Sequence, residues 1–479
     1  MLRKLRIVLA ALSFIGITLL FLGIGRDWWG WMPRLQLLPA TLRLVGGATL
    51  GNVAVVLGIL LLTLLAGRIY CSVICPLGVF QDVVLWCRRT LGRLFPKSKA
   101  LRKRFKYNKE PRFVRYPVAA LMIAAVIFDI QIVVALLGPY SAYGRMVRSV
   151  VGGGPAPLLL AAGVTFVLIV LCAWLWGRAY CNTVCPVGTV LGCVSSFQLF
   201  GVTVDESKCV KCGACSRVCK SSCIQEGTLS IDRSRCVDCF DCIGVCRQGA
   251  LSFGRVRRTA VPEGVKAAPE APQGDGKGRR AFIATSALVL GTGLAASAQN
   301  MKVDGGLADI VPKRPVDREP RLVPPGAGSV RDFYDKCTAC QLCVSHCPNG
   351  VLRPSTDLEH FLQPQMGYEN GFCRPECTAC GEVCPAGAIL PVQKDAKTLI
   401  HIGTAAVDPS ACLSATGAEK CGACARHCPT GAIIMTEAGG NLRPVVSEEQ
   451  CIGCGKCEYL CPVRPVSAIT VRGLQTHIS

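Results

Sequence analysis

The chain has 479 residues, a length that predicts two to four structural units, and it contains 32 cysteines. Small disulfide-rich secreted scaffolds are excluded by this length, and tight C-x2-C-x2-C-x3-C runs suit metal clusters better than disulfides. The net charge of +22 does not indicate a nucleic-acid partner, because residues 1–299 hold 36 Lys/Arg against 13 Asp/Glu and residues 300–479 hold 17 against 18. The positive excess lies in the apolar half, where membrane topology explains it.

Four apolar segments have spanning length or nearly so: residues 7–24, 44–66, 117–137 and 157–176. The basic start MLRKLR places the N-terminus inside, and the 13 Lys/Arg of residues 67–116 mark a cytoplasmic loop. We therefore expect residues 1–204 to form an α-helical four-helix membrane domain, multi-pass in a bacterial inner (cytoplasmic) membrane.

Two CxxxCP motifs follow the second and fourth of these segments, in GRIYCSVICPLG at 67–78 and GRAYCNTVCPVG at 177–188. Both spans return to the cytoplasm, so Cys71, Cys75, Cys181 and Cys185 are expected to meet at the cytoplasmic membrane face. A seventh cluster, a redox-active dithiol and simple packing before a helix-ending proline all remain open. A shared redox or metal site is favoured, because Arg68/Arg178 and Tyr70/Tyr180 recur together with the cysteines.

Residues 205–254 carry two C-x2-C-x2-C-x3-C groups and are expected to form a cytoplasmic ferredoxin domain with two [4Fe-4S] clusters. In such domains three cysteines of one group bind one cubane and the fourth cysteine binds the other. The predicted sets are Cys209, Cys212, Cys215 with Cys246, and Cys236, Cys239, Cys242 with Cys219. Lys220 and Arg247 stand where proline usually follows the fourth cysteine, and Cys223 is a candidate substitute for Cys219.

Residues 255–277 are rich in Pro, Gly, Ala and charge and are predicted to be a linker. Residues 278–298 contain Arg279-Arg280 before a Gly/Ala-rich apolar run that ends at Ala298. This pattern indicates a twin-arginine-type signal or anchor helix, and an ordinary fifth helix is the alternative. Either reading sends the remainder of the chain outside, and retention of the helix is favoured over cleavage after Ala298.

Residues 299–479 are predicted to form a periplasmic ferredoxin domain with four [4Fe-4S] clusters, whose metal binding supplies much of the folding free energy. Sixteen cysteines in four groups are the expected ligands: Cys337, Cys340, Cys343, Cys347, Cys373, Cys377, Cys380, Cys384, Cys412, Cys421, Cys424, Cys428, Cys451, Cys454, Cys457 and Cys461. Neighbouring groups can exchange their fourth cysteines, or outer groups can pair with outer, and the spacing leaves this open. Zinc is the alternative metal, but its sites use two separated CxxC knuckles rather than runs of four cysteines.

Six clusters and the two CxxxCP motifs leave Cys87, Cys172, Cys193 and Cys223, of which the first three are expected to be buried apolar side chains. The five histidines all lie after residue 345, which excludes a bis-histidine haem between the spans, and no CxxCH motif occurs. The chain lacks a glycine-rich dinucleotide fingerprint, so we expect it to pass electrons and assign no catalytic residue. Asp82 and Asp129 are candidate proton acceptors, with helix capping or pairing as the alternative role of Asp129.

With these motifs, residues 1–255 resemble NapH, and residues 278–479 resemble NapG, two iron–sulfur subunits of periplasmic nitrate reductase systems. The long gap between Cys412 and Cys421 in ACLSATGAEKCGACARHCP is similar to a feature of NapG, and MauN and MauM share the same motifs. The resemblance implies a multidomain fold, with an α-helical membrane domain and α+β ferredoxin-like domains. It also implies a quinol dehydrogenase that passes electrons from the quinol pool to periplasmic cytochrome or reductase subunits, such as those of nitrate reductase. A redox accessory protein for maturation of a metalloenzyme is the alternative function, and a membrane redox sensor is a weaker one.

Overall fold

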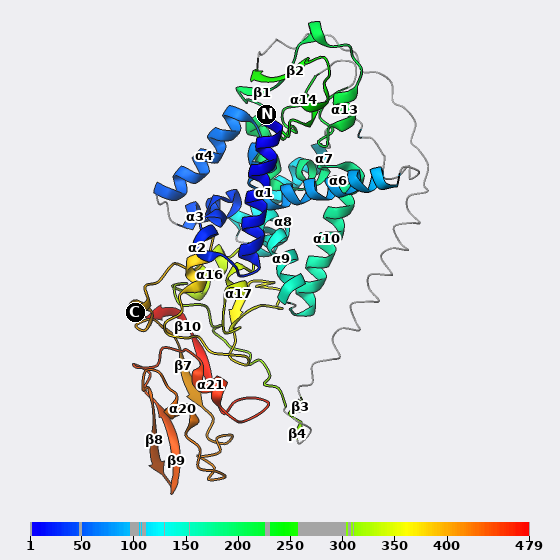
Figure 1. The fold of residues 1–479 in the computed structure, drawn as a ribbon. Helices are drawn as coiled ribbons and strands as arrows, with labels where there is room; N and C mark the ends of the chain where they lie inside the picture. Colours follow the sequence, from blue (N-terminus) through cyan, green and yellow to red (C-terminus); the bar gives the residue numbers. More distant parts are fainter. Residues whose placement is uncertain are drawn as a thin grey trace. The chain divides into compact units, whose positions relative to one another are not determined.

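The computed structural model describes residues 2–46, 50–95, 105, 107, 112–128, 130–152, 154–225, 230–256, 303–304, 308–309 and 311–478. The predicted signal or anchor helix and nearly all of the predicted linker lie outside these residues, as does Asp129. The described residues are mixed helix and strand, as the cysteine motifs and apolar segments predicted (Figure 1).

The apolar half is helical. Its longer helices are α1 (Leu2–Phe21), α3 (Leu37–Gly46), α4 (Leu50–Ala66), α7 (Arg112–Ile127), α8 (Gln131–Leu137), α9 (Pro139–Gly152) and α10 (Ala156–Trp176). Short helices α2 (Arg26–Trp29) and η1 (Met32–Leu35) connect α1 to α3. By length and hydropathy α1 and α10 could cross a membrane, whereas α4 is apolar but shorter.

The third expected segment, residues 117–137, does not form one helix in the structure. Helix α7 ends at Ile127, where the backbone N–H of Ile130 reaches back five residues to the carbonyl of Ala125 at 2.8 Å. Gln131 then begins α8 with a buried side chain that donates to the carbonyl of Asp335. Hydropathy alone could not reveal this break, because apolar residues continue on both sides of it.

The two CxxxCP motifs have the same local structure. In each, a glycine with positive φ (Gly67, +75°; Gly177, +71°) precedes a five-residue helix that carries the first cysteine. These short helices are α5 (Ile69–Val73) and α11 (Ala179–Thr183). The second cysteine then stands at the N-cap of the next helix, α6 (Pro76–Leu94) or α12 (Pro186–Ser195), whose first residue is proline. Proline fits this first position because its φ is already helical and its missing N–H would have no partner there.

The N-terminal ferredoxin unit, residues 200–255, is a small two-stranded domain. Strand β1 (Phe200–Val204) pairs antiparallel with β2 (Leu251–Arg255), so the two ends of the unit meet. Between them lie η2 (Glu206–Lys208) and the short helices α13 (Ala214–Val218) and α14 (Asp241–Val245), each of which contains one cysteine and ends next to another (Figure 1). Cysteines make up much of its buried apolar cluster, so the unit has little conventional core.

The C-terminal ferredoxin unit, residues 315–478, combines short helices with three two-stranded antiparallel sheets. The sheets pair β5 (Leu352–Pro354) with β6 (Pro364–Met366), β7 (His401–Val407) with β10 (Ile469–Ile478), and β8 (Ile433–Ala438) with β9 (Asn441–Val446). The helices are α16 (Val330–Lys336), α17 (Leu342–Ser345), α18 (Ala379–Val383), α19 (Lys394–Lys397), α20 (Ala423–Arg426) and α21 (Lys456–Leu460).

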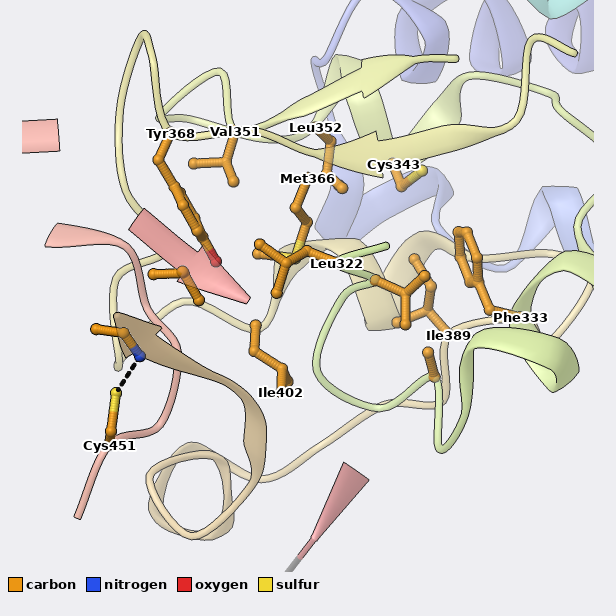
Figure 2. Packing of buried hydrophobic residues seen from close by; sticks show 14 of the residues in the cluster. Leu322, Phe333, Cys343, Val351, Leu352, Met366, Tyr368, Ile389, Ile402 and Cys451 are labelled. Carbon is orange, nitrogen blue, oxygen red and sulfur yellow. Dashed lines mark hydrogen bonds between the residues drawn. The ribbon is translucent and has the colours of Figure 1, made fainter. Parts of the chain in front are cut away.

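One apolar cluster runs through this unit and is interleaved with cysteines. Figure 2 shows Leu322, Met366 and Ile402 at its centre, with Cys343 and Cys451 at its edges. The backbone N–H of Ala405 in β7 donates to Cys451 Sγ at 3.4 Å, the dashed line in Figure 2. The core therefore packs directly against candidate ligands rather than forming a separate layer.

Candidate metal centres

Two cavities in the N-terminal ferredoxin unit are each lined by cysteines from both halves of that unit. The first is lined by Cys209, Cys212, Cys215 and Cys246. The second is lined by Cys236, Cys239 and Cys242, together with Cys219 and Cys223. The fourth cysteine of each group thus crosses to the cavity of the other group, which is the arrangement that the spacing predicts.

Cys223 lies beside Cys219 rather than in place of it. Their Sγ atoms are 3.4 Å apart, and both side chains are buried. The hydrogen bond between the two thiols lowers the pKa of Cys219 and raises the pKa of Cys223. Both thiols line the second cavity and are hydrogen-bonded to each other, so Cys223 stays a candidate ligand beside Cys219.

The first two groups of the C-terminal unit exchange their fourth cysteines in the same way. One cavity is lined by Cys337, Cys340, Cys343 and Cys384. A second is lined by Cys373, Cys377, Cys380 and Cys347. Neighbouring groups therefore pair with each other, a choice that the sequence left open.

In the last two groups, a cysteine of one group again lies near the fourth cysteine of the neighbouring group. Burial raises the pKa of Cys454 to about 11, and the charge of Cys428, from the preceding group, adds to the shift. Cys424 interacts with Cys412 and Cys421 of its own group. These three cysteines therefore come together despite the long sequence gap between Cys412 and Cys421. The backbone N–H of Cys373 donates to the carbonyl of Cys454 at 2.9 Å, so the two pairs of groups adjoin.

The backbone of the four regular C-x2-C-x2-C groups is wound in one distinctive way. In each, the residues immediately before and after the second cysteine have positive φ: Lys211 and Gly213, Asp238 and Phe240, Ala339 and Gln341, Gly453 and Gly455. Left-handed conformations cost a non-glycine residue about 1–2 kcal/mol. Alternation of left- and right-handed residues turns successive N–H groups toward one concavity, a geometry found at iron–sulfur sites. These concavities and their thiol donors fit iron–sulfur clusters, and spacing alone did not predict the winding.

Among the described residues, no three Cys, His, Asp or Glu side chains lie close enough to hold a single metal ion. In a four-iron cubane with four cysteine ligands, each thiolate binds a different iron, so the ligands need not meet at one point.

Lys220, which replaces the usual proline, docks the N-terminal ferredoxin unit on the CxxxCP helices. Its Nζ lies 2.9 Å from Asp82 of α6 and 3.5 Å from Asp241 of α14. Its carbonyl accepts from the backbone N–H of Arg178 at 2.8 Å. The second replacement, Arg247, lines the first cavity of the unit.

Asp82 is the centre of this ion-pair network. Arg6 and Arg178 also bind its carboxylate, at 3.0 and 2.9 Å. Burial would raise the pKa of Asp82, but the charges of Arg178, Lys220 and Arg6 hold it well below its usual range. Asp82 is consequently a poor proton acceptor, although its position after the first CxxxCP motif had made it a candidate.

The structure also brings the two CxxxCP motifs together. Arg68 of the first motif donates to the carbonyl of Cys181, and Arg178 of the second donates to the carbonyl of Cys71. All four cysteines of the motifs are buried. Cys87 and Cys172 are half-buried and Cys193 is exposed, so the expectation of a buried side chain is wrong for Cys193.

Family models for iron–sulfur proteins match five segments of the chain. A 4Fe-4S binding domain model matches residues 49–93 and again 158–201, which are the two CxxxCP repeats. A second 4Fe-4S binding domain model matches residues 202–225 and 330–353, and a 4Fe-4S dicluster domain model matches residues 419–464. The chain therefore contains several iron–sulfur domains.

The chain is also similar to named ferredoxin-type proteins. It is 31% identical to the ferredoxin-type protein NapF of Escherichia coli over 178 residues, which are 37% of this chain and 100% of NapF. The chain belongs to the Nap and Mau family of ferredoxin-type proteins. It is 33% identical to the methylamine utilization ferredoxin-type protein MauM of Methylobacillus flagellatus, over 31% of this chain and 67% of MauM. Identity with the ferredoxin-type protein NapH of Escherichia coli is 30%, over 38% of this chain and 55% of NapH.

No solved structure matches the chain. The predicted resemblance to NapH, NapG and MauM is confirmed, and this ferredoxin-type protein is an iron–sulfur protein with a role in electron transfer. The individual ligand sets remain predictions that the cavities support.

Proposed function

We propose that this ferredoxin-type protein is a membrane-bound quinol dehydrogenase of a nitrate reductase-like system, which delivers electrons to periplasmic cytochrome or reductase subunits. The observation that carries the proposal is that its two ferredoxin units bind opposite ends of the same long apolar helices. Such an arrangement serves transfer between a membrane pool and an acceptor on the far side.

Helix α1 contacts one ferredoxin unit at each end. Near its start, Arg3 pairs with Asp241 of the N-terminal unit at 2.9 Å. Near its end, the carbonyl of Leu20 is 2.9 Å from Nε2 of His346 in the C-terminal unit. Twenty residues of α-helix are about 30 Å long, the thickness of a bilayer's hydrocarbon core.

Helix α10 also contacts one ferredoxin unit at each end, but its start contacts the C-terminal unit and its end contacts the N-terminal unit. Leu158, near its start, packs with Ala339 and Leu362 of the C-terminal unit. At its end, a Cβ on Gly177 would lie 2.3 Å from the carbonyl of Lys220 in the N-terminal unit. Both helices therefore support the two ferredoxin units on opposite sides of a membrane, and the basic residues 67–116 assign the cytoplasmic side to the N-terminal unit.

Exposed apolar side chains on the helices support a lipid environment. On α10, Leu160 is 59% exposed and Leu168 49%, and on α4 Leu57 is 59% exposed. An apolar surface of this kind on several helices is typical of contact with a membrane or a partner rather than with water.

The ferredoxin units would hold six [4Fe-4S] clusters, each of which accepts and releases one electron when bound. The chain's own residues position these sites: Lys397 donates to Cys373 Sγ at 3.3 Å, and Lys220 holds the N-terminal unit in place. Hydrogen bonds to the sulfurs tune the potentials of such sites.

Anaerobic purification of the full chain in detergent, followed by addition of menadiol or duroquinol, tests the proposal. We expect the visible absorption of oxidised iron–sulfur clusters to bleach, and reduced-cluster EPR signals to appear. If dithionite reduces the clusters but neither quinol analogue does, quinol dehydrogenation is wrong, and a redox accessory role becomes the better explanation.

A further inference from the structure

The two CxxxCP repeats are joined by an exchange of arginines. Arg178 Nη1 donates to the carbonyl of Cys71 at 2.8 Å, and Arg68 Nη2 donates to the carbonyl of Cys181 at 3.1 Å. Both arginine side chains are 0% exposed. The arginine of each repeat thus hydrogen-bonds the first cysteine of the other repeat, so the two cysteine pairs share one environment.

Two glycines make this close approach possible. A Cβ on Gly78 would lie 2.1 Å from the carbonyl of Cys71, and one on Gly188 would lie 2.0 Å from that of Cys181. In both cases the arginine of the other repeat is the next neighbour, at 3.5 and 2.9 Å. The same contact made twice, once by each repeat, indicates a two-fold arrangement about the cysteines.

The four thiols share one buried space with polar donors. Gln81 Nε2 lies 3.3 Å from Cys181 Sγ, and the backbone N–H of Gly188 donates to Cys185 Sγ at 3.4 Å. Cys71, Cys75 and Cys185 belong to one buried cluster, and Arg68 Nη2 lies 3.9 Å from Cys71 Sγ and 3.1 Å from the carbonyl of Cys181. Cys71, Cys75, Cys181 and Cys185 are therefore mutual neighbours, and bringing four thiolates together needs compensating positive charge.

Positive charge at this space exceeds negative charge. The buried cations are Arg6, Arg68, Arg178 and Lys220, whereas the carboxylates beside them are Asp82, Asp238 and Asp241. The side-chain hydrogen bonds of Arg68 go to neutral groups, which are Asn182 Oδ1, two backbone carbonyls and Cys71 Sγ. The carboxylate of Asp238 interacts with the Arg68 charge and accepts from the backbone N–H of Arg68, not from its guanidinium. Arg68 Nε has no partner among the described residues. A buried cation of this kind favours an anion beside it.

Packing alone explains neither the exchanged arginines nor the excess of cations. An iron–sulfur cluster with four thiolate ligands explains both, because thiolates are its usual ligands and the ligated cluster is an anion. We propose that Cys71, Cys75, Cys181 and Cys185 bind one [4Fe-4S] cluster that the two repeats share, and that Arg68 and Arg178 are its positioning residues. The proposal deepens the iron–sulfur role and does not depend on quinol as the donor.

The site adjoins candidate ligands of both ferredoxin units. Asn182, next to Cys181, donates to the carbonyl of Ser221 at 3.4 Å, close to Cys219. Cys340 of the C-terminal unit belongs, with Tyr70 and Tyr140 of the apolar half, to the same buried cluster as Cys71 and Cys75. A shared cluster here would lie in packing contact with the surroundings of both units.

Iron, zinc and acid-labile sulfide counts on the anaerobically purified full chain test the proposal. Wild type should contain roughly 28 irons, from four per cubane at seven sites. The decisive comparison is between C71S/C75S, C181S/C185S and the variant with all four substitutions. A shared site predicts that each of the three loses about four irons and four sulfides, and the same component of the Mössbauer spectrum. One separate cluster per repeat instead predicts a loss of about eight irons only when all four cysteines are replaced.

The matched control is C87A/C193A, which removes one cysteine from each repeat outside the site and should keep all the iron. Unchanged iron in the three test variants, or a loss of zinc in place of iron, would overturn the proposal. If the cysteine variants are poorly folded, Arg68→Gln offers a second test. It should keep the iron but shift the midpoint potential of one cluster to a more negative value, and Arg68→Lys should restore it. An unshifted potential in Arg68→Gln would refute the positioning role. Quinol reduction can fail without affecting any of these counts, so the two proposals are tested separately.

Discussion

At the scale of single residues, departures from the ferredoxin motif report contacts with the rest of the molecule. Proline usually follows the fourth cysteine, but Lys220 does so here and joins two buried carboxylates, Asp82 and Asp241. The spacing of cysteines could not assign this role, because the partners lie far away in the sequence. Cys223 is a comparable case, since only the structure shows its hydrogen bond with Cys219.

Asp82→Asn should weaken the docking of the N-terminal unit. The substitution leaves Arg6, Arg178 and Lys220 without their shared carboxylate, and removal of one partner from a buried ion pair costs about 3–5 kcal/mol. Thermal unfolding and limited proteolysis of the detergent-solubilised protein would measure the loss. The exposed Asp205, which pairs with Lys208, provides the control Asp205→Asn, for which we expect no change. Equal behaviour of the two variants would contradict the network's role.

At the scale of elements, the turn before each CxxxCP helix depends on glycine. Gly177 has φ +71° and its missing Cβ would meet the carbonyl of Lys220, and Gly67 makes the equivalent approach to Asp238. The repeated glycine was visible in the sequence, but the two different surfaces that it approaches were not. The break between α7 and α8 was also hidden, because the apolar run continues through it.

Gly177→Ala should therefore destabilise the protein by at least about 1–2 kcal/mol, from left-handed strain alone, and further through the clash with Lys220. The control is Gly163→Ala in the same helix α10, where a Cβ meets nothing within 4 Å. Alanine favours a helix interior over glycine, so this control should be neutral or slightly stabilising. Melting temperatures of both variants would show the difference, and a neutral Gly177→Ala would argue against close docking.

In the C-terminal unit, Glu458 of α21 holds β10 in register. Its carboxylate accepts from the backbone N–H of Val471 at 2.8 Å and pairs with the buried Arg318. Glu458→Ala should cost about 3–5 kcal/mol, because it leaves Arg318 buried without its carboxylate partner. Chemical denaturation would measure this cost against Glu437→Ala, an exposed glutamate of β8 whose loss should have little effect. Similar denaturation midpoints for both variants would refute the role of Glu458 in holding β10 in register.

At the scale of the whole molecule, the two ferredoxin units contact opposite ends of α1 and α10. Hydropathy and charge predicted opposite sides of a membrane from residues 67–116 and the apolar segments. The contacts of Arg3 and Leu20 give an independent reason for the same expectation.

The predicted topology can be tested with epitope tags in the full-length protein. A tag after Ser479 should be removed by protease added to intact spheroplasts, whereas a tag inserted within residues 257–277 should be protected. Lysed spheroplasts serve as the control, where both tags should be cleaved. Protection of both tags, or loss of both, in intact spheroplasts would contradict the arrangement.

Iron removal should affect the molecule unevenly. The N-terminal ferredoxin unit buries cysteines in place of much conventional core, and the apolar core of the C-terminal unit packs directly against candidate ligands. An anaerobic chelator should therefore unfold residues 200–255 and 315–478. Helices α1, α4 and α10 depend on apolar packing and should keep their helical circular dichroism. Rapid proteolysis of the apolar helices after chelation would contradict this division.

The sequence by itself determined the cysteine groups, the internal repeat, the apolar helices apart from the break between α7 and α8, and the iron–sulfur family, because each is written in local spacing or composition. Tertiary structure alone decided which groups exchange their fourth cysteine, as Cys347 and Cys384 show. It also decided that Arg68 and Arg178 are exchanged between the repeats, and that Lys220 joins a ferredoxin unit to α6. The physical reason is that buried charges and thiols take their partners from distant segments, and only the folded chain brings those segments together.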